Sequence, residues 1–357
     1  MSNSVAITSA SRLARPLNRL ALAALPLGLS LLFTVAIIVL VGAPPLAVLQ
    51  RMVDGAFGDD VRRGDVVAAW VPLTLCSLGL LLTFTAGLWN IGIEGQIVLG
   101  AIGATWAVRT FPGLPAPVLL PLVLLGAALF GAAWGWLVGA LKVYGNVHEI
   151  FGGLGLNFVA MGLTNYLIFG PWSQPGRATV SGTEPYPPDA WLPTLEPLRV
   201  SPVAVALTLL VLLFIYVSLR GTTWGLQLKA IGHNLRSAFL LGIRTQRQML
   251  LAFALCGACA GLAGAVQTTV TYHRLIPSIS SGYGYLAILV ALLSAFRAVW
   301  VAPIAFLFAA LSMGSRPLQI ELNLASSLGG VIQGVLVLLV VLTQGLRGIG
   351  NPSADRD

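Results

Sequence analysis

The feature that most constrains this chain is a series of long apolar runs without charge. Residues 20–40, LALAALPLGLSLLFTVAIIVL, show none of the apolar–polar alternation that the strands of a membrane β-barrel require. About 20 apolar residues is the length that an α-helix needs to cross a bilayer. Only 9% of the 357 residues are charged, against about 25% in soluble domains. We therefore predict an all-α polytopic membrane protein.

The apolar content predicts about ten transmembrane helices. The 57% of the chain that is hydrophobic is enough for about ten spans of ~20 residues each. A secretory signal has an apolar core of only about 7–15 residues, so the longer first run predicts an uncleaved helix. The stretch 69–110 contains either two spans, one interrupted pair or a re-entrant hairpin. The expected spans are 21–43, 69–88, 91–110, 115–141, 150–170, 201–219, 248–268, 283–297, 299–315 and 327–345, with long polar connections at 44–68, 171–200 and 220–247.

The distribution of charge predicts the orientation of these spans. If the N-terminus is cytoplasmic, twelve of the 20 basic residues fall inside and eight of the 12 carboxylates fall outside, as the positive-inside rule requires. The tails 1–20 and 346–357 are then cytoplasmic and flank a transmembrane domain of residues 21–345. The proline-rich connection 171–200 is external, where it either meets a ligand or binding protein or is a passive connector, and 220–247 is cytoplasmic. The net charge of +8 therefore reflects topology and predicts no nucleic-acid partner.

The sequence contains no arrangement typical of an enzyme, a metal site or a cofactor site. The three histidines are scattered, and no nucleophile–base pair or ligand set emerges. Cys256 and Cys259 form a CxxC on an expected membrane helix, where cysteines are typical small packing residues, and Cys76 also lies in an apolar stretch. The chain has no GxxxxGK[ST] phosphate loop. We expect no catalytic residue, no metal and no cofactor.

An unusual group of polar residues and glycines interrupts one expected span. The segment GLWNIGIEGQIVLGA contains Asn90, Gly92, Glu94, Gly95 and Gln96. A charge at the bilayer centre costs at least about 2.5–3.5 kcal/mol, so we expect Glu94 to face protein or a water-filled path. The glycines weaken the helix by about 1 kcal/mol each relative to alanine. Three roles stay open for Glu94: a structural hydrogen-bond cluster, direct substrate contact, and a gate or interface.

The connection 220–247 is predicted to form two short helices. Thr222 or Thr223 can cap the first, Asn234 can cap the second, and Gly242 is suited to end it. The side chains that the second helix exposes are Phe239, Leu240 and Arg236. An amphipathic helix of this kind must bury its apolar side, either on the membrane surface or in a groove of a soluble partner.

Two further patterns concern helix packing and the later spans. Glycines four residues apart, Gly131, Gly135 and Gly139 on one helix and Gly257 and Gly261 on another, predict close backbone approach. The segment SGYGYLAILVALL opens a span with a flexible backbone, and its tyrosines are also typical of an interfacial anchor. The candidates for a substrate path or gate are Asn90, Glu94, Gln96, Asn157, Asn165 and Tyr283.

Several of these segments resemble the permease subunits of ABC importers for nucleosides and simple sugars, within the larger branched-chain amino acid and ribose permease superfamily. The resemblance is carried by AGLWNIGIEGQIVLGA, GNVHEIFGGLGLNFVAMGLTNYLIFGPW, GTTWGLQLKAIGHNLRSAFLLGI, SGYGYLAILVALL and VIQGVLVLL, and covers roughly residues 70–345 in order. Two departures occur: His148-Glu149 replaces a common Asn-Glu pair, and SAFRAVW replaces a segment with Gly and Asn-Pro. Neither changes the transport class that the resemblance implies.

The resemblance implies a non-catalytic permease of the cell membrane with the ABC importer permease fold, working by alternating access around a central path. It implies as partners a cytoplasmic ABC ATPase, an extracellular solute-binding protein and a second permease subunit, which is a copy or a different chain, all within membrane lipid. It also implies that the ATPase docks on Gly221–Arg244, with candidate coupling residues Gly232, Asn234, Arg236, Phe239, Leu240 and Gly242. The alternatives are a secondary transporter or channel with Glu94 as a proton or ion site, and, less favoured, an intramembrane enzyme.

Overall fold

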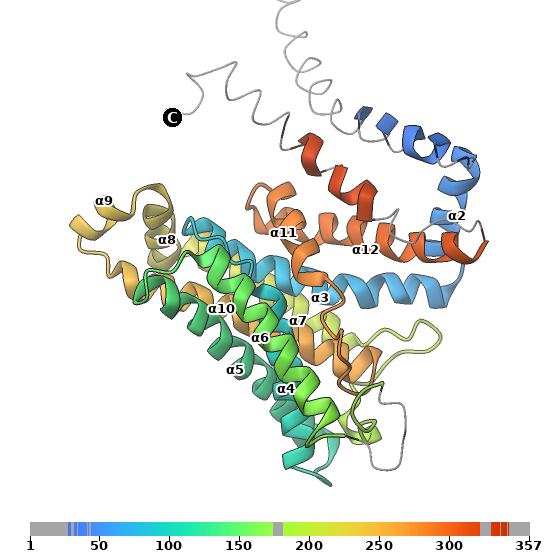
Figure 1. Ribbon diagram of the computed structural model, residues 1–357, viewed down its shortest axis with the longest axis horizontal. Helices are drawn as coiled ribbons and strands as arrows, with labels where there is room; N and C mark the ends of the chain where they lie inside the picture. The colour runs from blue at the N-terminus through green and yellow to red at the C-terminus, as the bar shows by residue number, and fades with distance from the viewer. Residues whose placement is uncertain are drawn as a thin grey trace, which may run out of the picture. The chain divides into compact units, whose positions relative to one another are not determined.

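The computed structural model describes residues 28–29, 32–33, 35–40, 42, 44–173, 181–321, 330–335, 337–340 and 342. Within these residues the protein is built from helices, and the only β pairing is an isolated bridge between Leu195 and Val200. Two compact units are formed by residues 58–310 and by residues 1–57 with 311–357. The α-helices are α2 Pro45–Phe57, α3 Asp60–Thr85, α4 Ile93–Thr110, α5 Ala116–Val143, α6 Glu149–Phe169, α7 Pro202–Gly221, α8 Thr223–His233, α9 Leu235–Leu240, α10 Thr245–Val266, α11 Tyr283–Leu293 and α12 Ala298–Glu321 (Figure 1). A short 3₁₀ helix, η1, covers Pro188–Ala190, and a π-helical segment, η2, continues α10 over Gln267–Thr271.

Six helices in the described part of the chain are long and apolar enough to cross a membrane. They are Asp60–Thr85, Ala116–Val143, Glu149–Phe169, Pro202–Gly221, Thr245–Thr271 and Ala298–Leu318. This confirms the all-α membrane class, and helices α4 and α11 add shorter segments at two of the expected spans. The first expected span, 21–43, and the last, 327–345, lie partly outside the described residues.

The larger unit has a central pair of helices and a surrounding layer. The apolar windows of α3 and α10 are 83% and 72% buried, whereas those of α5, α6 and α7 are only 22–28% buried. Helix α10 packs against α3, α4 and α5, which places it at the centre of the unit. The outward faces of the surrounding helices are apolar, as expected for side chains that meet lipid or another subunit.

The glycine pattern of α5 and α10 produces a very close helix contact, as predicted. The two helices lie side by side in Figure 1. A Cβ atom at Gly131 would meet the carbonyl oxygen of Gly257, and a Cβ atom at Gly261 would meet that of Ala127. Because both interfaces lack side chains here, the backbones touch directly.

The connection 44–68 differs from the prediction of a polar loop. Residues Pro45–Phe57 form α2, and α3 begins at Asp60, earlier than the expected start at residue 69. The Asp59 side chain caps α3 by accepting a hydrogen bond from the Arg62 N–H at 2.8 Å. In the smaller unit, Val48 and Met52 of α2 pack with Ile38 and Leu318 in an apolar cluster.

Candidate functional site

The polar segment singled out in the sequence lies at a break between two helices. Helix α3 ends at Thr85 and α4 begins at Ile93, so residues 86–92 are non-helical. Gly87 adopts a left-handed backbone conformation with φ of 72°, which glycine tolerates better than other residues. Gly95 is helical, so the interruption precedes it. A break in the helix is therefore present at 86–92, which includes Gly92, whereas Gly95 does not interrupt α4.

Two amide side chains, one in the break and one in the first turn of α4, hydrogen-bond to each other. Asn90 and Gln96 exchange two hydrogen bonds, each of 3.1 Å, and both side chains are fully buried. The Asn90 amide also donates to the Cys256 sulfur of α10 at 3.1 Å. Cys256 is near the midpoint of the candidate span Thr245–Thr271, so this cluster lies at the mid-level of a membrane helix.

Asn157 of α6 joins the same break from a neighbouring helix. Its side-chain oxygen accepts a hydrogen bond from the Gly95 N–H at 2.8 Å, and its amide donates to the Ile91 carbonyl at 3.0 Å. The backbones are close, since a Cβ atom at Gly153 would lie 2.6 Å from the Gly92 nitrogen. One side chain thus satisfies a donor and an acceptor that the interrupted helix leaves free.

Glu94 connects α4 to the start of α11. Its carboxylate accepts a hydrogen bond from the Tyr285 N–H at 3.1 Å, and the side chain is only 6% exposed. The Ser280 hydroxyl and the Gly284 N–H also hydrogen-bond to this carboxylate. These N–H groups belong to the first turn of α11, which has no intrahelical acceptor for them. Glu94 therefore caps α11 from another helix, and the positive end of the α11 dipole favours its negative charge.

The six path candidates do not form one group. Asn90, Glu94, Gln96 and Asn157 surround the break. Tyr283 is the first residue of α11 and is buried, whereas Asn165 is exposed on α6, about two turns beyond Asn157.

The two helices predicted in the 220–247 connection are present as α8 and α9. The Gly225 N–H donates to the Thr222 hydroxyl at 3.1 Å, and the Ser237 N–H donates to the Asn234 side chain at 2.9 Å. Both caps are therefore as predicted, with Thr222 as the first. Gly242 has φ of 83° just beyond α9, which confirms it as the stop.

The apolar side of α9 is open. Phe239 is 66% exposed and Leu240 is 77% exposed, and Arg236 beside them is exposed as well. Three residues before α9 begins, Gly232 of α8 lies against the end of α3, where the break starts, because a Cβ atom there would meet the Thr85 carbonyl oxygen. The sequence offered no sign of this contact, which places α8 beside the last residue before the break.

Two further groupings were not expected from the sequence. Lys142 at the end of α5 forms an ion pair with the buried Glu149 of α6 at 2.7 Å, which fixes the turn between these helices. Residues 181–200, the described C-terminal part of the connection 171–200, are held to the end of α10 and to the segment after it, because the Tyr186 N–H donates to the His273 carbonyl and the Leu192 N–H donates to the Thr269 carbonyl. Burial lowers the pKa of His273 below its ordinary value.

The described residues hold no group of three or more His, Cys, Asp or Glu side chains that could bind a metal ion. The three cysteines are free thiols buried in the helices. The cluster around the break therefore consists of amides, one carboxylate, the Cys256 thiol and backbone groups, which can hold helices together or contact a neutral polar solute.

Comparison with known proteins identifies the family. Residues 64–341 match the model of the branched-chain amino acid transport system permease component. The chain belongs to this family. It is similar to the guanosine ABC transporter permease protein NupP of Bacillus subtilis, with 29% identity over 299 residues that cover 82% of this chain and 85% of the relative. The glucose ABC transporter permease protein TsgB13 of Haloferax volcanii is 33% identical over 289 residues, covering 78% and 76%. The nucleoside ABC transporter permease protein NupB of Lactococcus lactis is 25% identical over 282 residues, covering 77% and 78%.

The family and the six apolar helices establish this permease as a multi-pass protein of the plasma membrane. The break between α3 and α4 lies within the matched range, as do α8, α9 and α11.

Proposed function

We propose that this chain is the membrane-spanning permease subunit of an ATP-driven ABC importer for a nucleoside or a simple sugar. The observation that carries the proposal is similarity over most of the chain to permeases named for guanosine, nucleosides and glucose. The family match favours this function over a secondary transporter or channel. The chain itself is non-catalytic, and a partner protein hydrolyses ATP.

The proposed topology follows from the charge distribution. About ten helices cross the membrane, the tails 1–20 and 346–357 are cytoplasmic, and the transmembrane domain occupies residues 21–345. The connection 171–200 faces outward, where an extracellular solute-binding protein delivers the solute. The second permease subunit is a copy or a different chain and completes the path.

The helix pair α8–α9 is the proposed docking site for the ATPase. The exposure of Phe239 and Leu240 supports this role, because two large apolar side chains beside Arg236 suit a groove in a soluble partner. Asn234 and Gly242 define the ends of α9, while Gly232 holds α8 against the break. Movement of the ATPase would then reach the centre of the permease directly.

Glu94 is proposed to be a structural cap rather than a substrate contact. Its hydrogen bonds to the first turn of α11 support this, since they occupy the carboxylate with protein donors. Asn90, Gln96 and Asn157 stabilise the same break. Asn165 and Tyr283 stay candidates for the path, Asn165 because an exposed amide on a membrane helix needs a polar partner.

The proposal is tested by uptake into proteoliposomes that contain this permease with the ATPase and second permease encoded beside it. Radiolabelled guanosine, uridine and glucose are offered with the cognate binding protein, with ATP or a non-hydrolysable analogue inside the vesicles at the ATPase side. We expect uptake of a nucleoside or a sugar only when ATP is hydrolysed. Uptake driven by a proton or sodium gradient without the ATPase would overturn the proposal.

A further inference from the structure

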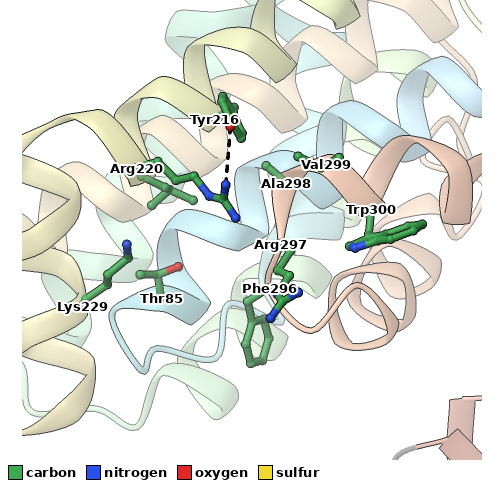
Figure 2. A pocket seen from close by; sticks show the side chains of 10 residues that line it. Thr85, Tyr216, Arg220, Lys229, Phe296, Arg297, Ala298, Val299 and Trp300 are labelled. Atoms are coloured by element: carbon green, nitrogen blue, oxygen red, sulfur yellow. Dashed lines mark hydrogen bonds between the residues drawn. The ribbon is translucent and has the colours of Figure 1, made fainter. Parts of the chain in front are cut away.

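A basic cavity lies where α7, α8 and the start of α12 meet, apart from the polar cluster at the break. It has a volume of about 440 Å³, within the range of about 300–1,000 Å³ typical of small-molecule sites. Figure 2 shows its lining, with Arg220 from the end of α7, Lys229 from α8 and Arg297 just before α12. None of its lining residues is acidic, and no salt bridge of the described residues involves these three cations.

Arg220 is held in place by an aromatic neighbour and not by opposite charge. The Arg220 guanidinium lies over the Tyr216 ring, 5.3 Å from its centroid, and donates a hydrogen bond to the Tyr216 hydroxyl at 3.5 Å (Figure 2). Three like charges around one cavity repel each other, so an anion that enters it is favoured. The first turn of α12 also borders the cavity, and its backbone N–H groups carry partial positive charge.

The cavity lies at the level where a membrane ends. Arg220 is in the last turn of the candidate span Pro202–Gly221, and Arg297 immediately precedes the candidate span Ala298–Leu318. Apolar side chains flank the cations, with Val299 54% exposed and Trp300 55% exposed. A tryptophan at the end of a span is typical of the interface between lipid headgroups and acyl chains.

We propose that this cavity binds the phosphate headgroup of an anionic phospholipid, from the leaflet on the side of the α8–α9 connection. The phosphate oxygens accept hydrogen bonds from Arg220, Lys229 and Arg297, and the acyl chains lie along Val299 and Trp300. Basic pockets between helices at this side of a membrane are suited to such headgroups. An acidic segment of the ATPase is less suited, because the exposed apolar residues of α9 do not line the cavity.

The lipid site has a consequence for the permease as an assembly. Lys229 belongs to the same helix as Gly232, which contacts the end of α3. A bound headgroup would therefore link α8 to the end of α7 and the start of α12. It would fix the position of the α8–α9 connection relative to the membrane surface. The cavity shares no lining residue with the polar cluster at the break, so the inference does not depend on which solute is carried.

The test is lipid retention by the purified full-length permease, measured by native mass spectrometry after exchange into phosphatidylglycerol or phosphatidylcholine. The double variant Arg220→Gln with Arg297→Gln is compared with Arg244→Gln with Arg247→Gln, which removes the same charge from exposed positions outside the cavity. Each basic residue near an anionic surface contributes about a fivefold factor, so phosphatidylglycerol affinity should fall about 30-fold in the first variant. It should fall much less in the second.

Three further measurements distinguish lipid binding from misfolding, from binding of free phosphate and from a contact with a protein. The charge-conserving pair Arg220→Lys with Arg297→Lys should retain phosphatidylglycerol, which excludes misfolding as the cause of a loss. Thermal stabilisation of the wild type by inorganic phosphate equal to that by phosphatidylglycerol would overturn the lipid proposal in favour of a free anion. Unchanged lipid retention in the glutamine variant, with loss of ATPase co-purification, would overturn it in favour of a protein contact.

Discussion

The hydrogen bonds of Glu94 make a quantitative prediction about two substitutions. In Glu94→Leu, the Tyr285 and Gly284 N–H groups lose their acceptor inside the protein. A buried donor without a partner costs about 1–3 kcal/mol, so two such groups cost about 2–6 kcal/mol. A typical folded domain is stable by about 5–15 kcal/mol. We therefore expect much less folded Glu94→Leu protein in the membrane.

Glu94→Gln keeps an oxygen in the position of the carboxylate. Its side-chain carbonyl can still accept from Tyr285, and the loss is the difference between a charged and a neutral hydrogen bond, about 1 kcal/mol. We expect near-normal abundance and substantial uptake of solute. The α11 dipole would lose its negative partner, a further effect of about 0.3–1 kcal/mol.

Both variants are assayed for membrane abundance by quantitative immunoblotting and for uptake in the assembled transporter. Normal abundance of Glu94→Gln with abolished uptake would refute the structural cap and assign Glu94 to the substrate or to a gate. Full uptake by Glu94→Leu at normal abundance would refute both roles. It would mean that the Tyr285 and Gly284 N–H groups form hydrogen bonds to water when the carboxylate is absent.

Three further predictions concern docking, topology and packing. Phe239→Asp should leave the permease in the membrane but reduce ATPase co-purification and transport-linked hydrolysis at least tenfold, because a charge replaces an apolar anchor; wild-type values for both would exclude docking through α9. Single cysteines at Ser181 and Ser237, in a Cys-free background, should react with impermeant maleimide from opposite sides, and labelling of both in intact cells would contradict the topology. Gly261→Ala should lower thermal stability by about 1–3 kcal/mol, since its Cβ atom would meet the Ala127 carbonyl; Gly162→Ala, which has open space, is the matched control, and equal stability of the two variants would contradict the tight contact.

Local sequence patterns predicted the parts of this fold that are determined locally. Thr222 and Asn234 cap helices because their side chains reach N–H groups only three residues away. The glycine spacing on α5 and α10 predicted close packing, although it did not say which helices would meet. Hydropathy located the lipid-crossing parts of helices but not their ends, so α3 extends from residue 69 back to Asp60, where a polar cap starts it.

The sequence predicted which residues belong to the candidate site, but it did not predict which of them form hydrogen bonds with each other. Glu94 was expected to find partners inside the protein because its charge is costly in lipid. The backbone group that the structure provides is 191 residues away, at Tyr285. Nothing local to either segment specifies that pairing. The Asn90 and Gln96 side chains instead form hydrogen bonds with each other.

The glycine contact between α5 and α10 also has a mechanical consequence. Only residues 241–244 separate α9 from α10, and α10 touches α5 backbone to backbone at Gly257 and Gly261. Flexible side chains, which could absorb a displacement by changing rotamer, are missing from this contact. A displacement of α9 would therefore move α10 and α5 together as one rigid body. The movement would reach the far ends of these two helices almost undiminished.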